Sequence, residues 1–308
     1  YQNTYNQTHN ITLDGGDAKF SYKTNLGYYS EKGIIKNTGF DRYSLNMNMD
    51  YKPTSRISFF GQVRGSVGKI KKANGVGLLQ TGVATDGQKS SLLPGPSFFQ
   101  ATSSVLSALT TTSDAGPKNL NTYVEGRYEI LPGLNITSAG SYDYNVDTED
   151  TFTPAAANSQ FAKIYSYYSY TSQLYNRNNV SYTKSLNEKH NFFVNLFSEM
   201  YIKKKQESIT RLERSPNDQF QGPLGYDGYF SRGGGILTSF YDQNQASFAA
   251  AFTYDYEKKY ILDLTYRIDG TSNSGSKDPY SKNPSIGLKW NFNKENWLKD
   301  VKWLNYGD

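Results

Sequence analysis

Alternation of apolar and polar residues is the dominant pattern along the chain. In residues 42–51 every even position is polar, and the odd positions are Tyr43, Leu45, Met47, Met49 and Tyr51. A period of two predicts a β-strand with one apolar and one polar face. The same alternation recurs from end to end, with a break at Asn176 and Asn178. It predicts an all-β protein with about ten strands, most of them long.

The length of these strands suggests a membrane. A strand from Tyr43 to Tyr51 would measure roughly 26 Å, and a tilt of about 40° brings this near the apolar band of an outer-membrane barrel, about 25 Å tall. We expect Tyr43 and Tyr51 to lie at the two membrane interfaces, with their hydroxyls toward the headgroups. The competing interpretation, a soluble β-sandwich, typically has strands of about 5–6 residues.

Connections between the predicted strands alternate in length. Short turns are expected at 14–17, 52–55, 131–133, 185–189, 257–259 and 293–296. Longer loops are expected at 31–39, 69–118, 147–164, 204–243 and 271–282. Outer-membrane barrels sort their connections in this way, with short periplasmic turns and long extracellular loops. Because lipid cannot satisfy an open sheet edge, the sheet is expected to close into a barrel.

Composition supports a membrane barrel and excludes several other classes. The chain has 27 tyrosines and 17 phenylalanines with a mean hydropathy of -0.69, an unusual combination for a soluble core. Its net charge of +5 is spread too diffusely to predict a nucleic-acid partner. Cysteine is absent, so no disulfide or thiolate metal site is available. No apolar run approaches the length of a transmembrane helix.

No pattern of catalytic or cofactor-binding residues emerges. The two histidines, His9 and His190, are far apart in sequence, and the glycines at 233–235 are not followed by a phosphate-loop lysine. We therefore predict neither an enzyme nor a cofactor or metal site. Basic residues at 69–72 and 203–205 are expected at the outer rim, where lipopolysaccharide phosphates are one candidate partner.

Two sets of residues are candidates for functional contacts. Charges on the lipid face would cost up to about 2–4 kcal/mol at the midplane, so charged residues of opposite parity to the apolar face are expected in the lumen. These are Arg64, Glu125, Arg127, Asp143, Arg177, Glu199, Asp263 and Arg267. A loop rich in aromatics is also predicted, for packing or for stacking on sugars. Its candidates are Tyr226, Tyr229, Phe230, Phe240 and Tyr241.

Two blocks of the sequence resemble SusC-like (RagA-like) TonB-dependent outer-membrane transporters of Bacteroidetes-type bacteria. Residues 27–43 are similar to the family stretch G-Y-x-x-x-x-G-I-I-K-N-T-x-F-x-R-Y, and residues 9–16 to H-N-x-x-x-x-G-G. Residues 254–272 are similar to Y-x-Y-x-x-x-Y-L-L followed by R-x-D-G-S-S, and residues 283–290 continue the match. The blocks stand in the family order.

The resemblance implies more than the residues show. It implies a 22-stranded barrel with an N-terminal plug, which imports glycans or peptides with energy passed through TonB and is capped by a SusD-like lipoprotein. No plug or TonB box is recognisable here. Residues 1–308 are therefore expected to be part of one outer-membrane barrel domain, with the plug domain and the remaining strands absent from this chain.

Two other functions remain open at this point. The chain is alternatively a structural subunit of a larger outer-membrane assembly for secretion or barrel assembly, with the same barrel fold and loops that dock partners. A further alternative is a small passive porin or an adhesin.

Overall fold

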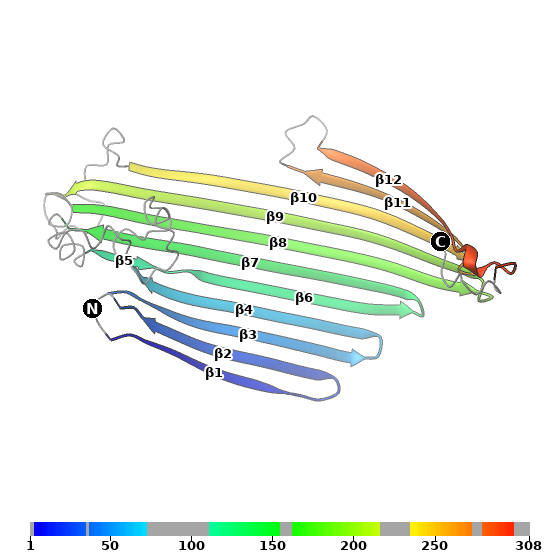
Figure 1. The fold of residues 1–308 in the computed structure, drawn as a ribbon, viewed down its shortest axis with the longest axis horizontal. Helices are drawn as coiled ribbons and strands as arrows, with labels where there is room; N and C mark the ends of the chain where they lie inside the picture. Colours follow the sequence, from blue (N-terminus) through cyan, green and yellow to red (C-terminus); the bar gives the residue numbers. More distant parts are fainter. Residues whose placement is uncertain are drawn as a thin grey trace.

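The chain folds into a single antiparallel sheet. The computed structural model describes residues 3–34, 37–72, 111–154, 162–215, 235–272 and 279–298. These ranges contain a 12-stranded sheet and the short 3-10 helix η5 (Phe292–Lys294). The strands curve side by side in chain order, with β1 and β12 at the two edges (Figure 1). Within the same ranges, no helix is long and apolar enough to cross a membrane.

Every strand except β5 is long, and the longest lie in the middle of the sheet. The strands are β1 (Tyr5–Gly16), β2 (Phe20–Lys32), β3 (Gly39–Thr54), β4 (Ile57–Lys71), β5 (Thr112–Ala115), β6 (Lys118–Leu131), β7 (Leu134–Thr153), β8 (Ala162–Leu186), β9 (His190–Ser215), β10 (Gly235–Tyr256), β11 (Tyr260–Thr271) and β12 (Tyr280–Trp290).

β5 and β6 occupy one position between β4 and β7. They are separated by Gly116 and by Pro117, which has no backbone N–H to give to a ladder.

Neighbouring hairpin turns are hydrogen-bonded to one another at one end of the sheet. In each case a backbone N–H of one turn donates to a carbonyl of the preceding turn. The pairs are Lys52 to Lys19 at 2.6 Å, Glu129 to Arg56 at 2.9 Å, Thr183 to Gly133 at 2.9 Å, Glu257 to Lys189 at 2.6 Å and Asn291 to Lys259 at 2.8 Å. The short connections therefore form a continuous rim, which corresponds to the predicted periplasmic side.

The central strands run further than the alternation predicted. β8, β9 and β10 contain 25, 26 and 22 residues. Residues 204–215 and 235–243 of the expected loop lie in β9 and β10, and Lys203, Lys204 and Lys205 lie inside β9. Tyrosines, which favour strands, are frequent in the extension of β8, whereas the extension of β9 is mainly charged and polar. A strand that continues into water has no need of an apolar face, so its sequence does not alternate.

The strand register sorts the side chains into two faces. Direct partners in an antiparallel pair point to the same side, so each row of partners belongs to one face. One row joins Tyr28, Tyr43 and Val67, and another joins Val194, Phe252, Leu264 and Ile286. We call this side the apolar face. On β12, Ile286 and Leu288 leave 71% and 82% of their surface exposed, an exposure that is costly in water and typical of a buried interface.

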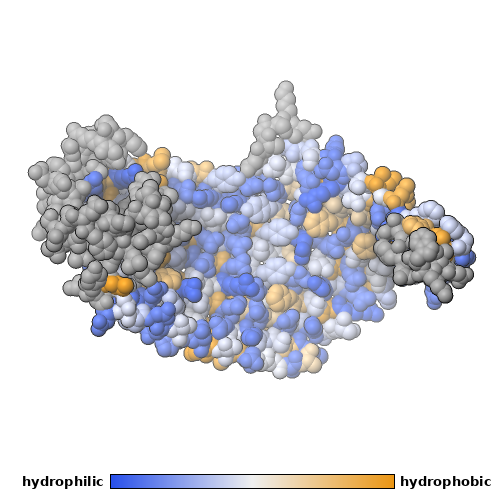
Figure 2. All heavy atoms as spheres, viewed as in Figure 1, coloured by the Kyte–Doolittle hydropathy of each residue, from blue (hydrophilic) through white to orange (hydrophobic). Residues whose placement is uncertain are grey.

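The opposite side is the polar face. Its rows contain Asn46 with Arg64 and Asn121, and Gln62 with Asn48 and Tyr123. The face of the sheet shown in Figure 2 is mainly hydrophilic over the strands. One sheet thus separates two environments of different polarity, as a barrel wall does.

A small polar patch interrupts the apolar face. It consists of Ser138, Asn176, Asn178 and Ser198, on β7, β8 and β9. Ser138 Oγ donates to Asn178 Oδ1 at 2.7 Å, and Asn178 Nδ2 donates to Asn176 Oδ1 at 2.7 Å and Ser198 Oγ at 3.3 Å.

Apolar rows flank this patch on both sides along the strands. Ile136, Val180 and Leu196 form the row toward the short turns, and Tyr142, Leu174 and Ile202 form the row toward the long connections. The polar patch therefore lies in the middle of the apolar band, which accounts for the weak alternation at Asn176 and Asn178.

Replacing the two asparagines of the polar patch is expected to stabilise the protein. In Asn176→Val/Asn178→Val, gain of apolar surface against lipid outweighs the lost hydrogen bonds, which are worth about 0.5–1.5 kcal/mol each. The free energy of unfolding from lipid vesicles, measured in urea, should rise by roughly 1 kcal/mol or more. The matched control Asn46→Val/Asn48→Val changes the polar face, and its free energy of unfolding should not rise. A lower value for the first variant would show that the patch does not meet lipid.

Candidate functional site

All eight residues predicted to face the lumen share the polar face. The register carries this face across the sheet from Arg64 on β4 to Asp263 and Arg267 on β11. The full set is Arg64, Glu125, Arg127, Asp143, Arg177, Glu199, Asp263 and Arg267. Five of them are organised into one arrangement of charges, which we call the charged belt, and the other three lie outside it.

The first half of the charged belt is centred on Glu125 of β6. Its Oε1 accepts from Arg127 Nε at 2.8 Å, and its Oε2 lies 3.7 Å from Arg177 Nη2. Tyr123 donates its hydroxyl to the same carboxylate. The Glu125 side chain is only 14% exposed, whereas Arg127 is 66% exposed. The carboxylate is thus enclosed by its partners, while the guanidinium of Arg127 remains open to ligand or solvent.

Arg177 reaches Glu125 across an intervening strand. Arg177 lies on β8 and Glu125 on β6, and both are register partners of Ala139 on β7. Ala139 is 2% exposed because the long side chains pass over it. A larger residue at this position would separate the two charges.

The second half of the charged belt repeats this arrangement around Arg267 of β11. Its Nη2 donates to Glu199 Oε1 on β9 at 2.9 Å, and its Nε donates to Asp269 Oδ1 at 2.7 Å. The intervening strand β10 carries the small residue Ser247, whose Oγ accepts from Arg267 Nη2 at 3.3 Å. Asn283 Nδ2 on β12 donates to Asp269 Oδ2 at 3.3 Å and extends the belt to the last strand.

The two halves meet in the middle of the sheet. Arg177 and Glu199 are direct register partners on β8 and β9, and Tyr175 donates its hydroxyl to Glu199 Oε2 at 3.1 Å. The charged belt therefore crosses the sheet from β6 to β12. It holds three arginines and three carboxylates, so its formal charges cancel. Such a surface offers many donors and acceptors to a polar ligand without strong selection by charge sign.

Several members of the charged belt do not stand out in the sequence. Tyr123, Tyr175, Ser247, Asp269 and Asn283 were not predicted. The available signal was the spacing of two between opposite charges, Glu125 with Arg127 and Arg267 with Asp269, which places both on one face of a strand.

Three of the predicted residues do not join the charged belt. Asp143 accepts from the side-chain amide of Asn121, and Asp263 Oδ1 accepts from Thr253 Oγ1 at 2.6 Å. Arg64 is the register partner of Asn46 and Asn121 and forms no ion pair with another described residue. They occupy the same face as separate polar positions.

Tyr43 and Tyr51 lie on the apolar face, near opposite ends of the apolar stretch of β3. Tyr43 is 63% exposed and lies 4.9 Å from Tyr28, measured between ring centroids. Tyr51 contacts Phe20 and Phe59 at 6.5 Å and 6.3 Å. Both residues thus belong to aromatic clusters of several strands. Their assignment to the two membrane interfaces stays a prediction.

The predicted aromatic loop is wrong in part. Phe240 and Tyr241 lie inside strand β10, paired with Gln206 and Lys205 of β9. As successive strand residues they point to opposite faces, so they cannot belong to one stacking surface. Strand β10 extends beyond the apolar band. Polar neighbours interrupt the alternation there, so the extension was not predicted from the sequence. Tyr226, Tyr229 and Phe230 lie outside the described residues.

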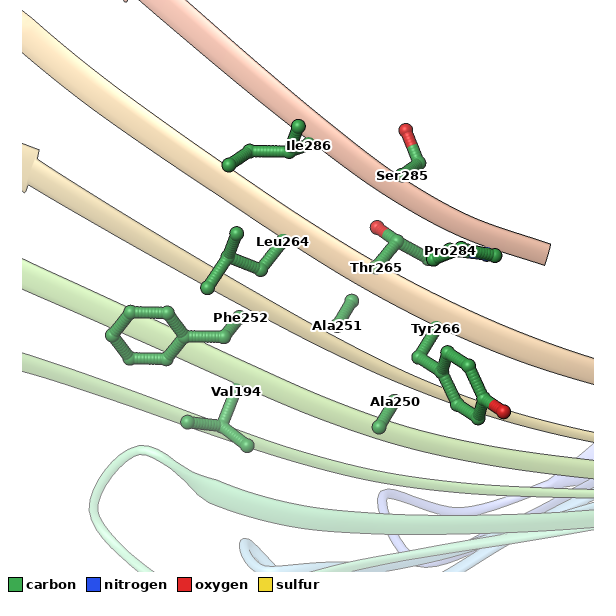
Figure 3. A pocket seen from close by; sticks show the side chains of 10 residues that line it. All are labelled: Val194, Ala250, Ala251, Phe252, Leu264, Thr265, Tyr266, Pro284, Ser285 and Ile286. Atoms are coloured by element: carbon green, nitrogen blue, oxygen red, sulfur yellow. The ribbon is translucent and has the colours of Figure 1, made fainter.

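A shallow groove of about 620 Å³ lies on the apolar face near β12. Figure 3 shows Val194, Phe252, Leu264 and Ile286 in one row, and Ala250, Tyr266 and Pro284 in the next. The small Ala250 leaves the depression between larger side chains. Its apolar lining suits hydrocarbon rather than a polar substrate. Among the described residues, no group of three or more histidine, aspartate or glutamate side chains is placed to hold a metal ion.

Curated proteins of two bacteria are similar to nearly the whole chain. TonB-dependent receptor P39 of Formosa agariphila is 22% identical over 96% of this chain and 29% of its own length. TonB-dependent receptor SusC of Bacteroides thetaiotaomicron is 22% identical over 96% of this chain and 32% of its own length. The chain therefore spans about a third of the curated relatives it matches. No family model matches it.

Solved structures show the same fold. The structure of the RagAB peptide transporter superposes with a TM-score of 0.69 at 16% identity, covering 95% of this chain and 34% of that chain. The ferric preacinetobactin receptor BauA of Acinetobacter baumannii superposes with a TM-score of 0.50 at 11% identity over 92% of this chain. The long strands and the two faces are those of an outer-membrane barrel, and the chain is similar to a SusC-like segment of TonB-dependent receptors, which are proteins of the bacterial outer membrane.

Proposed function

We propose that the chain forms part of the wall of a transporter barrel that imports glycans or peptides across the outer membrane. In this proposal the apolar face meets lipid and the polar face lines the lumen. TonB supplies the energy through parts of the protein outside this chain, and a SusD-like lipoprotein works with the barrel at the cell surface. The similarity to SusC and to the RagAB peptide transporter supports import as the activity.

The observation that carries this proposal is the separation of the two faces. Every charged residue of the charged belt has the parity opposite to the exposed apolar rows. Turning the sheet over would place three arginines and three carboxylates against hydrocarbon, at up to about 2–4 kcal/mol for each cation near the midplane. Electrostatics and hydrophobic burial both support this facing.

The rest of the barrel is also part of the proposal. β1 and β12 each pair on one side only among the described residues. In a bilayer an unpaired edge leaves backbone groups without partners, so other strands must pair with both edges. We propose that residues 1–308 belong to one barrel domain whose remaining strands, together with a plug domain, lie elsewhere in the protein. Lipopolysaccharide is the proposed lipid partner at the outer rim.

Spin labels at neighbouring positions of β6 test the facing. A label at Arg127, on the polar face, should be accessible to a water-soluble relaxation agent. A label at Tyr128, on the apolar face, should be accessible to oxygen dissolved in lipid. Electron paramagnetic resonance of the whole protein in vesicles distinguishes the two. The reversed pattern would overturn the assignment of the lumen.

Uptake in cells tests the activity. Deleting the gene for the whole protein should abolish import of a labelled glycan or peptide, and deleting TonB should do the same because import requires coupled energy. As a third test, uptake is measured after the proton gradient is dissipated, and it should be lost for the same reason. Import that continues without TonB would indicate a passive pore. Loss of other outer-membrane proteins with normal uptake would indicate a structural subunit.

A further inference from the structure

A polar groove of about 620 Å³ lies where three hairpin turns meet at the rim of short connections. It is lined by residues 18–19 of the first turn, residues 52–58 of the second, and Arg127, Glu129 and Asn135 beside the third. Ser58 and Arg127 are register partners, as are Glu129 and Asn135. Because Arg127 has polar-face parity, the groove opens on the polar face.

Backbone hydrogen bonds hold the groove in shape. Lys52 N–H donates to Lys19 O at 2.6 Å and joins the first turn to the second. Glu129 N–H donates to Arg56 O at 2.9 Å and joins the second turn to the third. The side chains of three separate hairpins are thus brought to one site by contacts that do not involve those side chains, which remain available for a ligand.

The groove carries an excess of positive charge. Its lining contains the cations Lys19, Lys52, Arg56 and Arg127 and one carboxylate, Glu129. Lys19, Lys52 and Arg56 form no ion pair with another described residue. Arg127 shares its charge with Glu125 at 2.8 Å. Three cations are therefore opposed by one carboxylate within the groove.

One turn carboxylate beside the groove, Asp17, uses an oxygen within its own turn. Asp17 accepts hydrogen bonds from the backbone N–H groups of Lys19 at 2.7 Å and Phe20 at 2.8 Å. These bonds, that of Phe20 first, hold the pKa of Asp17 below its usual range. Asp17 therefore keeps its charge, but it forms no ion pair with Lys19, Lys52 or Arg56.

We propose that this groove binds an acidic peptide segment of a periplasmic partner protein. Lysine and arginine side chains from three turns would pair with carboxylates spaced along an extended peptide. The hydroxyl of Ser58 and the amide of Asn135 offer hydrogen bonds to its backbone. The inference rests on the proposed assignment of the polar face to the lumen, and adds a protein contact at its periplasmic mouth.

Two other anionic ligands fit the groove less well. A phosphate site needs donors that converge on one point, whereas these cations are distributed over three turns. Phospholipid headgroups approach from the other face, where Phe20, Tyr51 and Phe59 form an aromatic cluster. The mixed lining of cations, an amide, hydroxyls and one carboxylate suits a peptide.

The test uses the full-length protein in nanodiscs of zwitterionic lipid. A fluorescein-labelled oligo-glutamate peptide serves as the probe, and its binding is followed by fluorescence anisotropy at low salt. Lys52→Gln/Arg56→Gln should weaken binding by roughly tenfold, because two exposed charge pairs are lost. The matched control Lys184→Gln/Lys258→Gln removes the same charge from the same end of the sheet, outside the groove, and should leave binding unchanged.

Four outcomes would overturn the proposal. In the first, the full-length protein does not bind the peptide; in the second, the groove and control variants lose binding equally. In the third, inorganic phosphate displaces the peptide at the same concentration as unlabelled peptide does. In the fourth, anionic phosphatidylglycerol in the nanodisc abolishes peptide binding. The spin labels at Arg127 and Tyr128 report separately on the lumen. If the label at Arg127 is accessible to water but the groove variant binds the peptide as well as the unaltered protein does, the peptide site is refuted and the lumen assignment stands.

Discussion

A bilayer interior offers no hydrogen-bonding partner to a peptide backbone, and this constraint organises the whole sheet. Each strand between β1 and β12 satisfies its backbone groups on its neighbours, so the side chains are free to follow the polarity of the two sides. Lipid favours Val194, Phe252 and Leu264 on one face, while Glu125, Arg177 and Arg267 project from the other. In the proposed orientation the apolar rows are exposed because their hydrophobic surroundings are the membrane, not a protein core.

Period-two alternation predicted the fold class because strand geometry leaves a direct record in the sequence. It located the central part of each long strand and the shared face of Arg64, Glu125 and Arg267. It could not locate strand ends, because the extensions of β8, β9 and β10 have polar residues on both sides. Phe240 and Tyr241 were assigned to a loop for this reason. The short β5 contains too few residues to show a period, and Gly116 and Pro117 separate it from β6.

The charged belt was less predictable because it depends on residues that carry no charge. Ala139 and Ser247 are small: Ala139 lies between Glu125 and Arg177, and Ser247 lies between Glu199 and Asp269. Parity places a residue on a face, but it does not specify which strands are neighbours or how far a guanidinium can reach. The polar patch at Asn176 and Asn178 shows the opposite case. There the sequence recorded an irregularity, and the register explained it as hydrogen bonding among Ser138, the two asparagines and Ser198.

The continuous rim of short connections also bears on how fast the sheet can fold. Nearly every strand pairs with its neighbour in sequence, so the contacts are local in the chain and contact order is low for a sheet of this size. Each new hairpin can add to the one before it through a strand ladder and a turn-to-turn hydrogen bond, such as Glu257 N–H to Lys189 O at 2.6 Å. The sheet can then grow one hairpin at a time, because the exposed edge of each completed hairpin is the pairing partner of the next.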